Sequence, residues 1–179
     1  MNYKTAKGWL TDSEREYLHK LAQESATIIN VGIEYGASIH CFAEGNPHAK
    51  IVAIDLIGNE KFVGNLKNSV AIIEEQACEI EELLTQNDIV FVKANSNTID
   101  LALEADLIFI DGGHDYKCVQ NDIAKFAPWA TNYLLFHDYS NAKIHEGVKK
   151  ALDEWHPQCF VKIAQVDTIA AYKRIKEGS

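Results

Sequence analysis

The sequence has no pair of cysteines close enough together to suggest a zinc site or a redox motif. Such sites normally require cysteines that are separated by only a few residues. The four cysteines are instead scattered along the chain, at Cys41, Cys78, Cys118 and Cys159. The N-terminus shows no signal-peptide pattern, so we expect reduced thiols and a cytoplasmic protein.

Clusters of lysine and arginine are also missing, and negative charge prevails. The chain has 17 basic and 26 acidic residues, which gives a formal net charge of −9. Nucleic-acid binding depends on basic groups that neutralise phosphates, so this balance disfavours DNA or RNA as a partner. It disfavours anionic membranes too, and the apolar runs are too short to span a bilayer. The expected partner is therefore a small molecule.

Internal repeats and low-complexity segments are absent, so a chain of 179 residues fits a single domain. We expect this domain to span residues 1–179, with a helical extension over residues 1–25. The segment Thr11-Asp12-Ser13-Glu14 has the pattern of a capping box, with Thr11 as the N-cap of a helix. Trp9 is expected to pack beside that helix.

The rest of the sequence alternates short apolar runs with stretches of helical character. Runs that are apolar throughout are typical of strands in a sheet covered by helices on both faces. Their alternation with helices predicts a doubly wound, Rossmann-like α/β fold. The last two strands are separated by a few residues, which predicts an antiparallel hairpin after a mostly parallel sheet. We expect strands over 27–31, 51–55, 89–92, 107–110, 133–136, 159–163 and 168–172, and helices over 37–44, 66–84, 119–126 and 147–155.

The first predicted strand ends in a turn that contains Gly32 and Gly36. Glycines let the backbone approach a ligand closely, and the next helix offers unpaired N–H groups to a carboxylate or phosphate. The spacing differs from the GxGxxG of dinucleotide-binding folds, and an ordinary strand–helix turn is the alternative. Asp55 ends the second strand, where a carboxylate can accept both hydroxyls of a ribose. The alternative for Asp55 is a helix N-cap or a solvated loop acid.

The sharpest local signal follows the fourth predicted strand, at residues 111–114, which read DGGH. A carboxylate at the end of a buried strand needs a partner or a metal, because burying an unpaired charge is costly. We therefore predict a divalent-cation site formed by Asp111 with His137 and Asp138, which follow the next strand. Oxygen ligands with one imidazole suit Mg²⁺ or Mn²⁺, with Zn²⁺ as the alternative. The competing interpretation is that these groups only hydrogen-bond the local loops.

These motifs resemble those of small class I S-adenosylmethionine-dependent methyltransferases, in the group known as methyltransferase family 24. The resemblance runs from about Ile28 to Tyr172. It is strongest at residues 110–116 with Asp122, at 136–139 and at 146–148, and residues 31–38 and the strand ending at Asp55 are similar too. The chain departs from the family pattern in two places. Asn30 stands where an acidic residue is usual, and residues 130–132 replace a Gly-Gly turn.

The resemblance implies a seven-stranded sheet with one reversed strand and S-adenosylmethionine as cofactor. The glycine loop would hold its methionine part, Asp55 the ribose, and Asn95 and Ser96 would lie near the adenine. Related metal-assisted enzymes place divalent ions at carboxylates that match Asp111 and Asp138. The cofactor contacts expected on this basis are Asn30, Gly32, Glu34, Tyr35, Gly36, Ser38, Asp55, Leu56, Asn95, Ser96 and Asp111.

The resulting hypothesis is O-methylation of a small-molecule or sugar-like acceptor. Asp111, His114 and His137 are the expected catalytic residues. A metal at Asp111 and Asp138 would lower the pKa of the acceptor hydroxyl, and either histidine would take its proton. His114 as general base is also implied by the resemblance. The alternatives are a dinucleotide-dependent oxidoreductase, a metal-dependent hydrolase, and a non-catalytic binding module made conceivable by Asn30.

Little of the chain is left over to close the site. Only the short N-terminal helix and the candidate lid segment around Gly58–Asn68 are left to cover it. We expect either a compact, open pocket or one completed by a second copy of the chain in a homo-oligomer. Four other histidines are expected to be surface or helix residues, namely His40, His48, His145 and His156.

Overall fold

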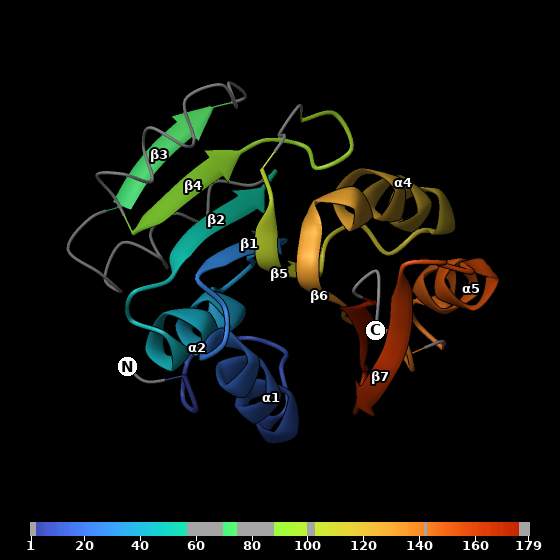
Figure 1. Ribbon diagram of the computed structural model, residues 1–179, viewed down its shortest axis with the longest axis horizontal. Coiled ribbons are helices and arrows are strands. Elements are labelled where there is room, and N and C mark those ends of the chain that lie inside the picture. Colours follow the sequence, from blue (N-terminus) through green and yellow to red (C-terminus); the bar gives the residue numbers. More distant parts are fainter. Residues whose placement is uncertain (1–2, 57–69, 75–87, 100–102, 142, 176–179) are drawn as a thin grey trace.

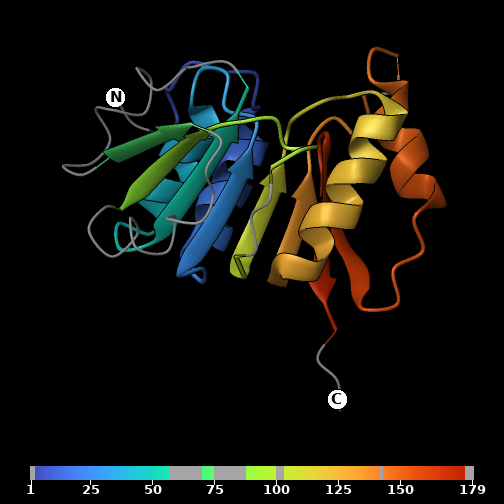
Figure 2. The same cartoon turned by 90° about the horizontal axis from the view of Figure 1, so that it is seen from above.

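The computed structural model describes residues 3–56, 70–74, 88–99, 103–141 and 143–175 (Figure 1). They form a mostly parallel sheet that carries α1 and α2 on one face and α4 and α5 on the other (Figures 1 and 2). The candidate lid, Gly58–Asn68, lies outside the described residues. Within the described chain, no helix is both long and apolar enough to cross a membrane.

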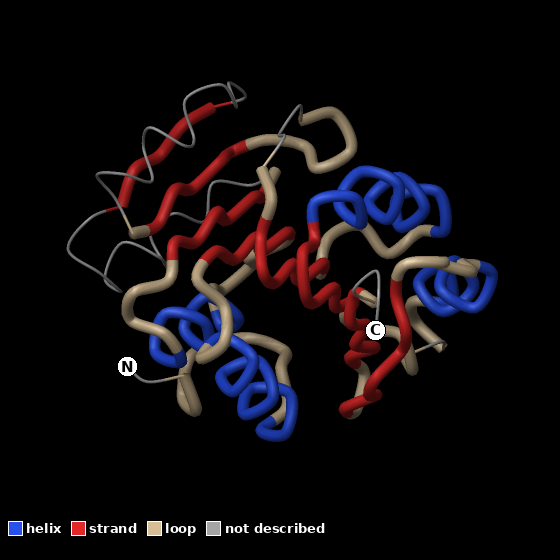
Figure 3. The backbone as a smooth tube through the Cα atoms, in the orientation of Figure 1, coloured by secondary structure: helices blue, strands red, loops and turns tan. Residues whose placement is uncertain are grey.

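The elements follow the strand–helix alternation expected from the sequence (Figure 3). The strands are β1 Thr27–Val31, β2 Lys50–Asp55, β3 Val70–Glu74, β4 Ile89–Lys93, β5 Ala105–Ile110, β6 Ala130–Phe136, β7 Phe160–Val166 and β8 Ile169–Arg174. The helices are α1 Asp12–Ala22, α2 Ala37–Gly45, α4 Tyr116–Phe126 and α5 Glu146–Glu154, and a short 3₁₀ turn, Ala127–Trp129, precedes β6.

The order of the strands shows at which edge of the sheet a ligand is expected to bind. Among the described residues the order is β3-β4-β2-β1-β5-β6-β8-β7. β1 pairs in parallel with both β2 and β5, so the strand order changes direction there. Ligands of such sheets bind at the carboxyl ends of strands near that point. β8 pairs antiparallel with β6 and β7, which confirms the predicted C-terminal hairpin.

One predicted element is wrong in part. Residues 70–74 were expected within a helix over 66–84, but they form β3, which pairs in parallel with β4 at the sheet edge. A short apolar run such as Val-Ala-Ile-Ile fits a strand as well as a buried helix, and its position beside β4 decides between them. Among the described residues the sheet therefore has one strand more than the seven expected, and residues 66–69 and 75–84 of the predicted helix lie outside the described part of the chain.

Two apolar cores hold the helices on the sheet. Alternate residues of each central strand point to opposite faces, so Ile28 packs under α1 and α2 while Ile29 packs under α4 and α5. The capping box of α1 is present as predicted: Glu14 N donates to Thr11 Oγ1 at 3.2 Å, and Thr11 N donates to Glu14 Oε2 at 2.8 Å. This cap fixes where α1 begins, next to the carboxyl edge of the sheet.

Candidate active site

A cavity of about 760 Å³ opens at the carboxyl ends of β1, β2, β4, β5 and β6. A volume of this size is typical of small-molecule sites. Ten of the predicted site residues line it: Gly32, Glu34, Asp55, Leu56, Asn95, Ser96, Asp111, His114, His137 and Asp138. The polar residues that follow five different strands therefore meet in one place.

Four residues expected to contact the cofactor do not line this cavity, namely Asn30, Tyr35, Gly36 and Ser38. Gly36 is the N-cap of α2 and has a φ of 82°, which a residue without a side chain adopts readily. Ser38 is buried in the first turn of α2. The Lys7 ammonium lies 3.9 Å above the centre of the Tyr35 ring. These residues support the glycine loop from outside the cavity.

Asn30 is fully buried at the end of β1, and its amide has a structural task. Its Nδ2 donates to the carbonyl oxygen of Gly32 at 2.6 Å, inside the glycine loop. A carboxylate cannot make this bond, because it has no hydrogen to donate at neutral pH. Asn30, which replaces the usual acidic residue, therefore supplies the hydrogen-bond donor that the Gly32 carbonyl requires.

Gly32 is required by the sheet itself. It has a φ of 80°, and a Cβ at this position would lie 1.9 Å from the carbonyl oxygen of Asp111. Asp111 N also donates to Val31 O at 2.8 Å, so the ends of β1 and β5 are held against each other. The close approach expected at this glycine is thus to the Asp111 backbone, and it fixes the distance between the glycine loop and Asp111.

Asp55 organises the glycine loop from the neighbouring strand. Its Oδ2 accepts hydrogen bonds from Ile33 N at 2.8 Å and from Glu34 N at 3.2 Å. Glu34 has a left-handed φ of 47°, an uncommon conformation for a residue with a side chain. The two bonds to Asp55 help to hold the loop in that shape at the wall of the cavity.

Asp111, His114, His137 and Asp138 converge into what we call the carboxylate–histidine cluster. His137 Nδ1 lies 3.1 Å from Asp111 Oδ1 and 3.3 Å from Asp138 Oδ2. His114 Nε2 lies 3.0 Å from the same Asp138 oxygen and 3.7 Å from Asp111 Oδ1. Asp138 has a left-handed φ of 61°, so its backbone conformation is also unusual. The sequence placed these four side chains at one sheet edge, and the structure brings them into contact distance.

Glu14 completes the surroundings of His137, a role that its place in the capping box did not reveal. Its Oε2 lies 3.5 Å from His137 Nε2, and its Oε1 accepts from Thr168 N at 2.9 Å and Thr168 Oγ1 at 2.6 Å. Burial alone would raise the pKa of Glu14, but the bonds from His137, Thr168 and Thr11 lower it to about 2. Helix α1 and the β7–β8 turn are thus joined behind the cluster.

The two imidazoles of the cluster favour the protonated form. Burial lowers the pKa of His137, but the facing carboxylates of Asp111, Asp138 and Glu14 outweigh it and raise that pKa to about 12. Asp111 and Asp138 raise the pKa of His114 to about 9. For Asp138, burial is outweighed by His114 and His137, which hold its pKa well below the usual range. His137 therefore keeps its positive charge among the carboxylates, whereas His114 loses its proton more easily.

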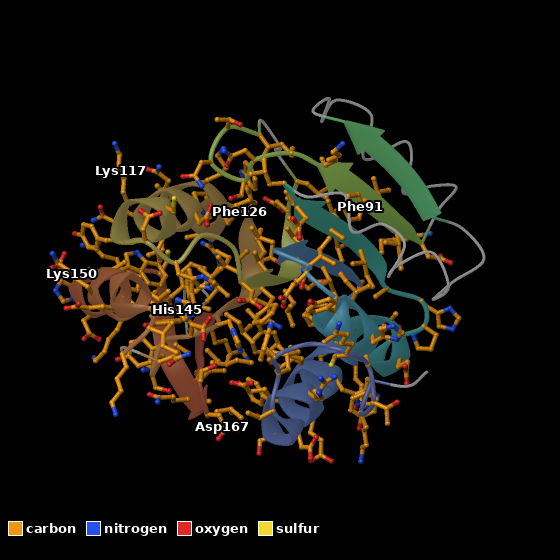
Figure 4. The ribbon with its side chains drawn as sticks, turned by 180° about the vertical axis from the view of Figure 1, so that it is seen from behind. Phe91, Lys117, Phe126, His145, Lys150 and Asp167 are labelled. Atoms are coloured by element: carbon orange, nitrogen blue, oxygen red, sulfur yellow. The ribbon has the colours of Figure 1, made fainter. Side chains whose placement is uncertain are left out.

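His145 lies beside the cluster, and the expectation that it is only a surface or helix residue is incomplete. It is the N-cap residue of α5, beside which Figure 4 labels it, and it lines the cavity. Its ring lies 4.0 Å from that of His114, and its Nε2 lies 3.7 Å from Asp138 Oδ2. Its position depends on tertiary packing, so no local sequence pattern marked His145 as a residue of the site.

Gly147 explains how the 146–148 motif serves the site from outside the cavity. A Cβ at Gly147 would lie 2.4 Å from both His114 O and Tyr116 N. The missing side chain lets the start of α5 press against the backbone that carries His114. This contact brings His145 next to the His114 ring.

The mouth of the cavity is apolar. Trp9, Leu56 and Ile144 line it and are strongly exposed. Trp9 does not pack against α1 as expected from the sequence; its Nε1 donates to Glu34 Oε1 at 2.8 Å. The bond to the glycine loop holds the indole at the mouth. Other lining residues that sequence reasoning missed are Thr11, Glu14, Asn97, Cys118, Asn141, His145 and Thr168.

Two overlapping groups of side chains have the donor atoms that a metal ion needs. One is the predicted set, Asp111, His137 and Asp138; the other is His114, Asp138 and His145. Within each group the ligand atoms lie within 4.8 Å of one another. Both share Asp138, and the first leaves His114 outside the ligand set.

Comparisons with known proteins agree with this geometry. The family model described as "Methyltransferase domain" matches residues 29–139, which is more than half of the chain. No curated protein matches the sequence. Among solved structures, the SAH-bound Podospora anserina methyltransferase PaMTH1 is 13% identical with a TM-score of 0.66, over 94% of this chain and 80% of that one.

Two other structures are similar in fold. The MycE methyltransferase from the mycinamycin biosynthetic pathway, in complex with Mg, SAH and mycinamycin VI, is 14% identical with a TM-score of 0.65, over 99% of this chain and 54% of that one. An O-methyltransferase from Bacillus cereus in complex with SAH is 14% identical with a TM-score of 0.58, over 93% and 83%. Identities this low speak for the fold, whereas the family match covers the glycine loop, Asp55, Asp111 and Asp138. The chain therefore belongs to the class I S-adenosylmethionine-dependent methyltransferases, as its sequence motifs predicted.

Proposed function

We propose that this methyltransferase transfers a methyl group to a hydroxyl oxygen of a small-molecule acceptor. The observation that carries the proposal is the carboxylate–histidine cluster, which shares one cavity with the glycine loop and Asp55. Oxygen acceptors need a group that removes the hydroxyl proton, and the cluster supplies such groups beside the place where the cofactor is expected. The net charge of −9 favours a small molecule over nucleic acid as the acceptor.

His114 is the proton acceptor in this proposal. S-adenosylmethionine, when bound, supplies the methyl group, so the new bond joins acceptor oxygen to methyl carbon as the carbon–sulfur bond breaks. The acceptor proton passes to His114, and the Asp138 carboxylate at 3.0 Å stabilises the resulting imidazolium. His137 is less suited to this step because three carboxylates hold its proton. The glycine loop and Asp55 contribute chiefly by orientation, which can be worth roughly 7–11 kcal/mol.

Asp111, His137 and Asp138 would hold a divalent ion, for which Mg²⁺ and Mn²⁺ are the first candidates. Their ligand atoms lie within 4.8 Å of one another, and Glu14 faces the other nitrogen of His137, where a carboxylate orients a metal-binding imidazole. A bound ion would act as a Lewis acid toward the acceptor oxygen. Ion binding requires His137 to give up its proton at Nδ1, so binding would release a proton.

Calorimetric titration with S-adenosylhomocysteine, with and without Mg²⁺ or Mn²⁺, is the first test. We expect micromolar binding that Asp55→Asn weakens, whereas the exposed His156→Ala leaves it unchanged. A tighter complex in the presence of the ion, lost in Asp111→Asn, would support the metal site. Loss of the ion effect without loss of methyl transfer would exclude a metal role. If methyl transfer to hydroxyl acceptors survives His114→Ala at an unchanged rate, the assignment of the proton acceptor is wrong.

A further inference from the structure

The most exposed large apolar side chains of the described residues all lie at the mouth of one cavity. Trp9 is 78% exposed, Ile144 73% and Leu56 63%, while the other exposed apolar residues lie on β7 and after β8. Apolar area that remains open to water at a cavity mouth is typical of a binding surface, because a ligand that covers it releases the surrounding water.

Trp9 is exposed but held in place. Its indole nitrogen donates to Glu34 Oε1 at 2.8 Å. The preceding residue, Gly8, approaches α2 so closely that a Cβ there would lie 2.5 Å from the Ala37 Cβ. Arg15 Nε donates to Leu10 O at 3.1 Å on the other side. An aromatic ring that is fixed in advance binds a flat ligand at a low entropic cost.

Ile144 and Leu56 mark different ends of this mouth. Leu56 follows Asp55, on the side of the glycine loop. Ile144 directly precedes His145, whose ring lies 4.0 Å from that of His114 at a tilt of 31°, and the Ile144 backbone N–H donates to Asn141 O at 3.0 Å. Ile144 therefore belongs to the proton-accepting side of the cavity, and Leu56 to the cofactor side.

We propose that the acceptor is an aromatic alcohol whose ring is held by Trp9 and Ile144 while its hydroxyl faces His114. The inference rests on the proposed function and narrows its acceptor class. A flat ring with one polar edge matches apolar groups at the mouth and charged groups on the floor. A sugar-like acceptor can lay a C–H face on the indole, but it carries hydroxyls around its whole rim, and those against Ile144 would lose their water without gaining partners.

The test uses two probes, 2-naphthol and methyl β-glucoside, titrated into the full chain saturated with S-adenosylhomocysteine. Calorimetry and ligand-observed NMR report binding without any turnover. We expect 2-naphthol to bind in preference to the glucoside. Trp9→Ala should weaken 2-naphthol at least tenfold, which is about 1.4 kcal/mol, and Ile144→Ala severalfold. Trp9→Phe should retain most of the affinity, and Val161→Ala, at an exposed apolar residue of β7, should retain all of it.

Three results would overturn the proposal: preference for the glucoside, no binding of 2-naphthol, or unchanged binding to the Trp9→Ala variant. A fourth is an equal loss of S-adenosylhomocysteine affinity in Trp9→Ala, because Trp9 would then cover the cofactor. Failure of the proposed function gives a different result: the wild-type chain would bind 2-naphthol through Trp9 but would transfer no methyl group from S-adenosylmethionine to its hydroxyl. Thermal unfolding of each variant identifies any loss caused by misfolding.

Discussion

The two sides of the cavity draw their residues from very different distances along the chain. The glycine-loop side consists of residues 31–34, Asp55 and Asn95–Asn97, which lie at or just after the ends of three strands of the sheet. The carboxylate–histidine cluster lies after β5 and β6, and its outer partners come from α1, from the start of α5 and from the β7–β8 turn. The first side depends on local backbone shape, whereas the second depends on the packing of remote elements.

The two sides also differ in electrostatics. On the glycine-loop side, neutral backbone N–H groups are arranged around one carboxylate, Asp55. In the cluster, Asp111 and Asp138, together with Glu14 beside them, surround two imidazoles, and the shifted pKa values of His114 and Glu14 follow from that arrangement. We therefore expect substitutions on the first side to act through shape and substitutions in the second to act through charge and pH.

The largest expected effect comes from Gly32→Ala, which changes the close contact between the ends of β1 and β5, where the two sides of the cavity meet. The new methyl group would overlap the Asp111 carbonyl, and the φ of 80° is unfavourable for alanine. We expect a loss of unfolding free energy on the order of 3–5 kcal/mol together with loss of S-adenosylhomocysteine binding. Denaturant unfolding and calorimetry measure both. Gly112→Ala is the milder comparison: its Cβ would meet Val31 Cγ1 at 3.3 Å, a tight contact that requires only a shift of that side chain by a few tenths of an ångström. Equal losses in the two variants would contradict the role of the contact between Gly32 and the Asp111 backbone.

Glu14→Gln tests whether the remote contacts of the cluster matter for stability. The folded state holds the pKa of Glu14 near 2 against an ordinary value of 4.5, so its contribution is complete above pH 4.5 and is lost as the pH falls toward 2. We expect the variant to lose about 3 kcal/mol at pH 7, with a smaller difference from wild type at pH 3. Urea unfolding at both pH values measures this. Glu16→Gln, on the exposed side of α1, should change stability little; a similar loss there would refute the role of Glu14.

Asp138→Asn tests whether the charge of this carboxylate sets the pKa of His114. In the wild type, His114 must lose a proton that it holds up to about pH 9, so kcat/KM should rise with pH toward that value. Removing one of the two carboxylates that raise this pKa should move the inflection to lower pH by about one unit or more. NMR titration of the His114 ring gives the same quantity without turnover. Asp153→Asn on exposed α5 is the control, and an inflection that stays in place in Asp138→Asn would contradict His114 as the proton acceptor.

The smallest expected effect is a gain of stability in Asp122→Asn, behind the cluster on α4. Asp122 is fully buried, and its carboxyl oxygens have no well-formed hydrogen bond to the described part of the chain, so the nearby Ser96 and Lys125 offset its burial only in part. Burial raises its pKa from 3.8 to about 6. The folded protein therefore loses stability as the pH rises through that range, because the buried carboxyl group must ionise. We expect the variant to be more stable than wild type by about 1–2 kcal/mol at pH 8 and nearly equal at pH 4. Chemical unfolding that shows destabilisation at pH 8 would mean that the carboxylate has a partner in the folded protein.

Most of the fold was predictable because its signals are local. Apolar runs, the Thr11–Glu14 capping box and the glycines after β1 each depend on residues adjacent in sequence. The exception, β3, is an apolar run whose conformation is decided by pairing with β4. In the same way, the sequence predicted which residues stand at the carboxyl edge, since every parallel strand ends there.

The sequence by itself determined the α/β class, the methyltransferase family and the list of polar strand ends. Only the tertiary structure decided that Gly32 is fixed by the Asp111 backbone, that Asn30 acts as a donor to the loop, and that Glu14 and His145 flank the cluster. The physical reason is the range of the interactions. Periodicity and capping act over a few residues, whereas ion pairs and ring contacts depend on distances in space between segments that can be more than a hundred residues apart in sequence.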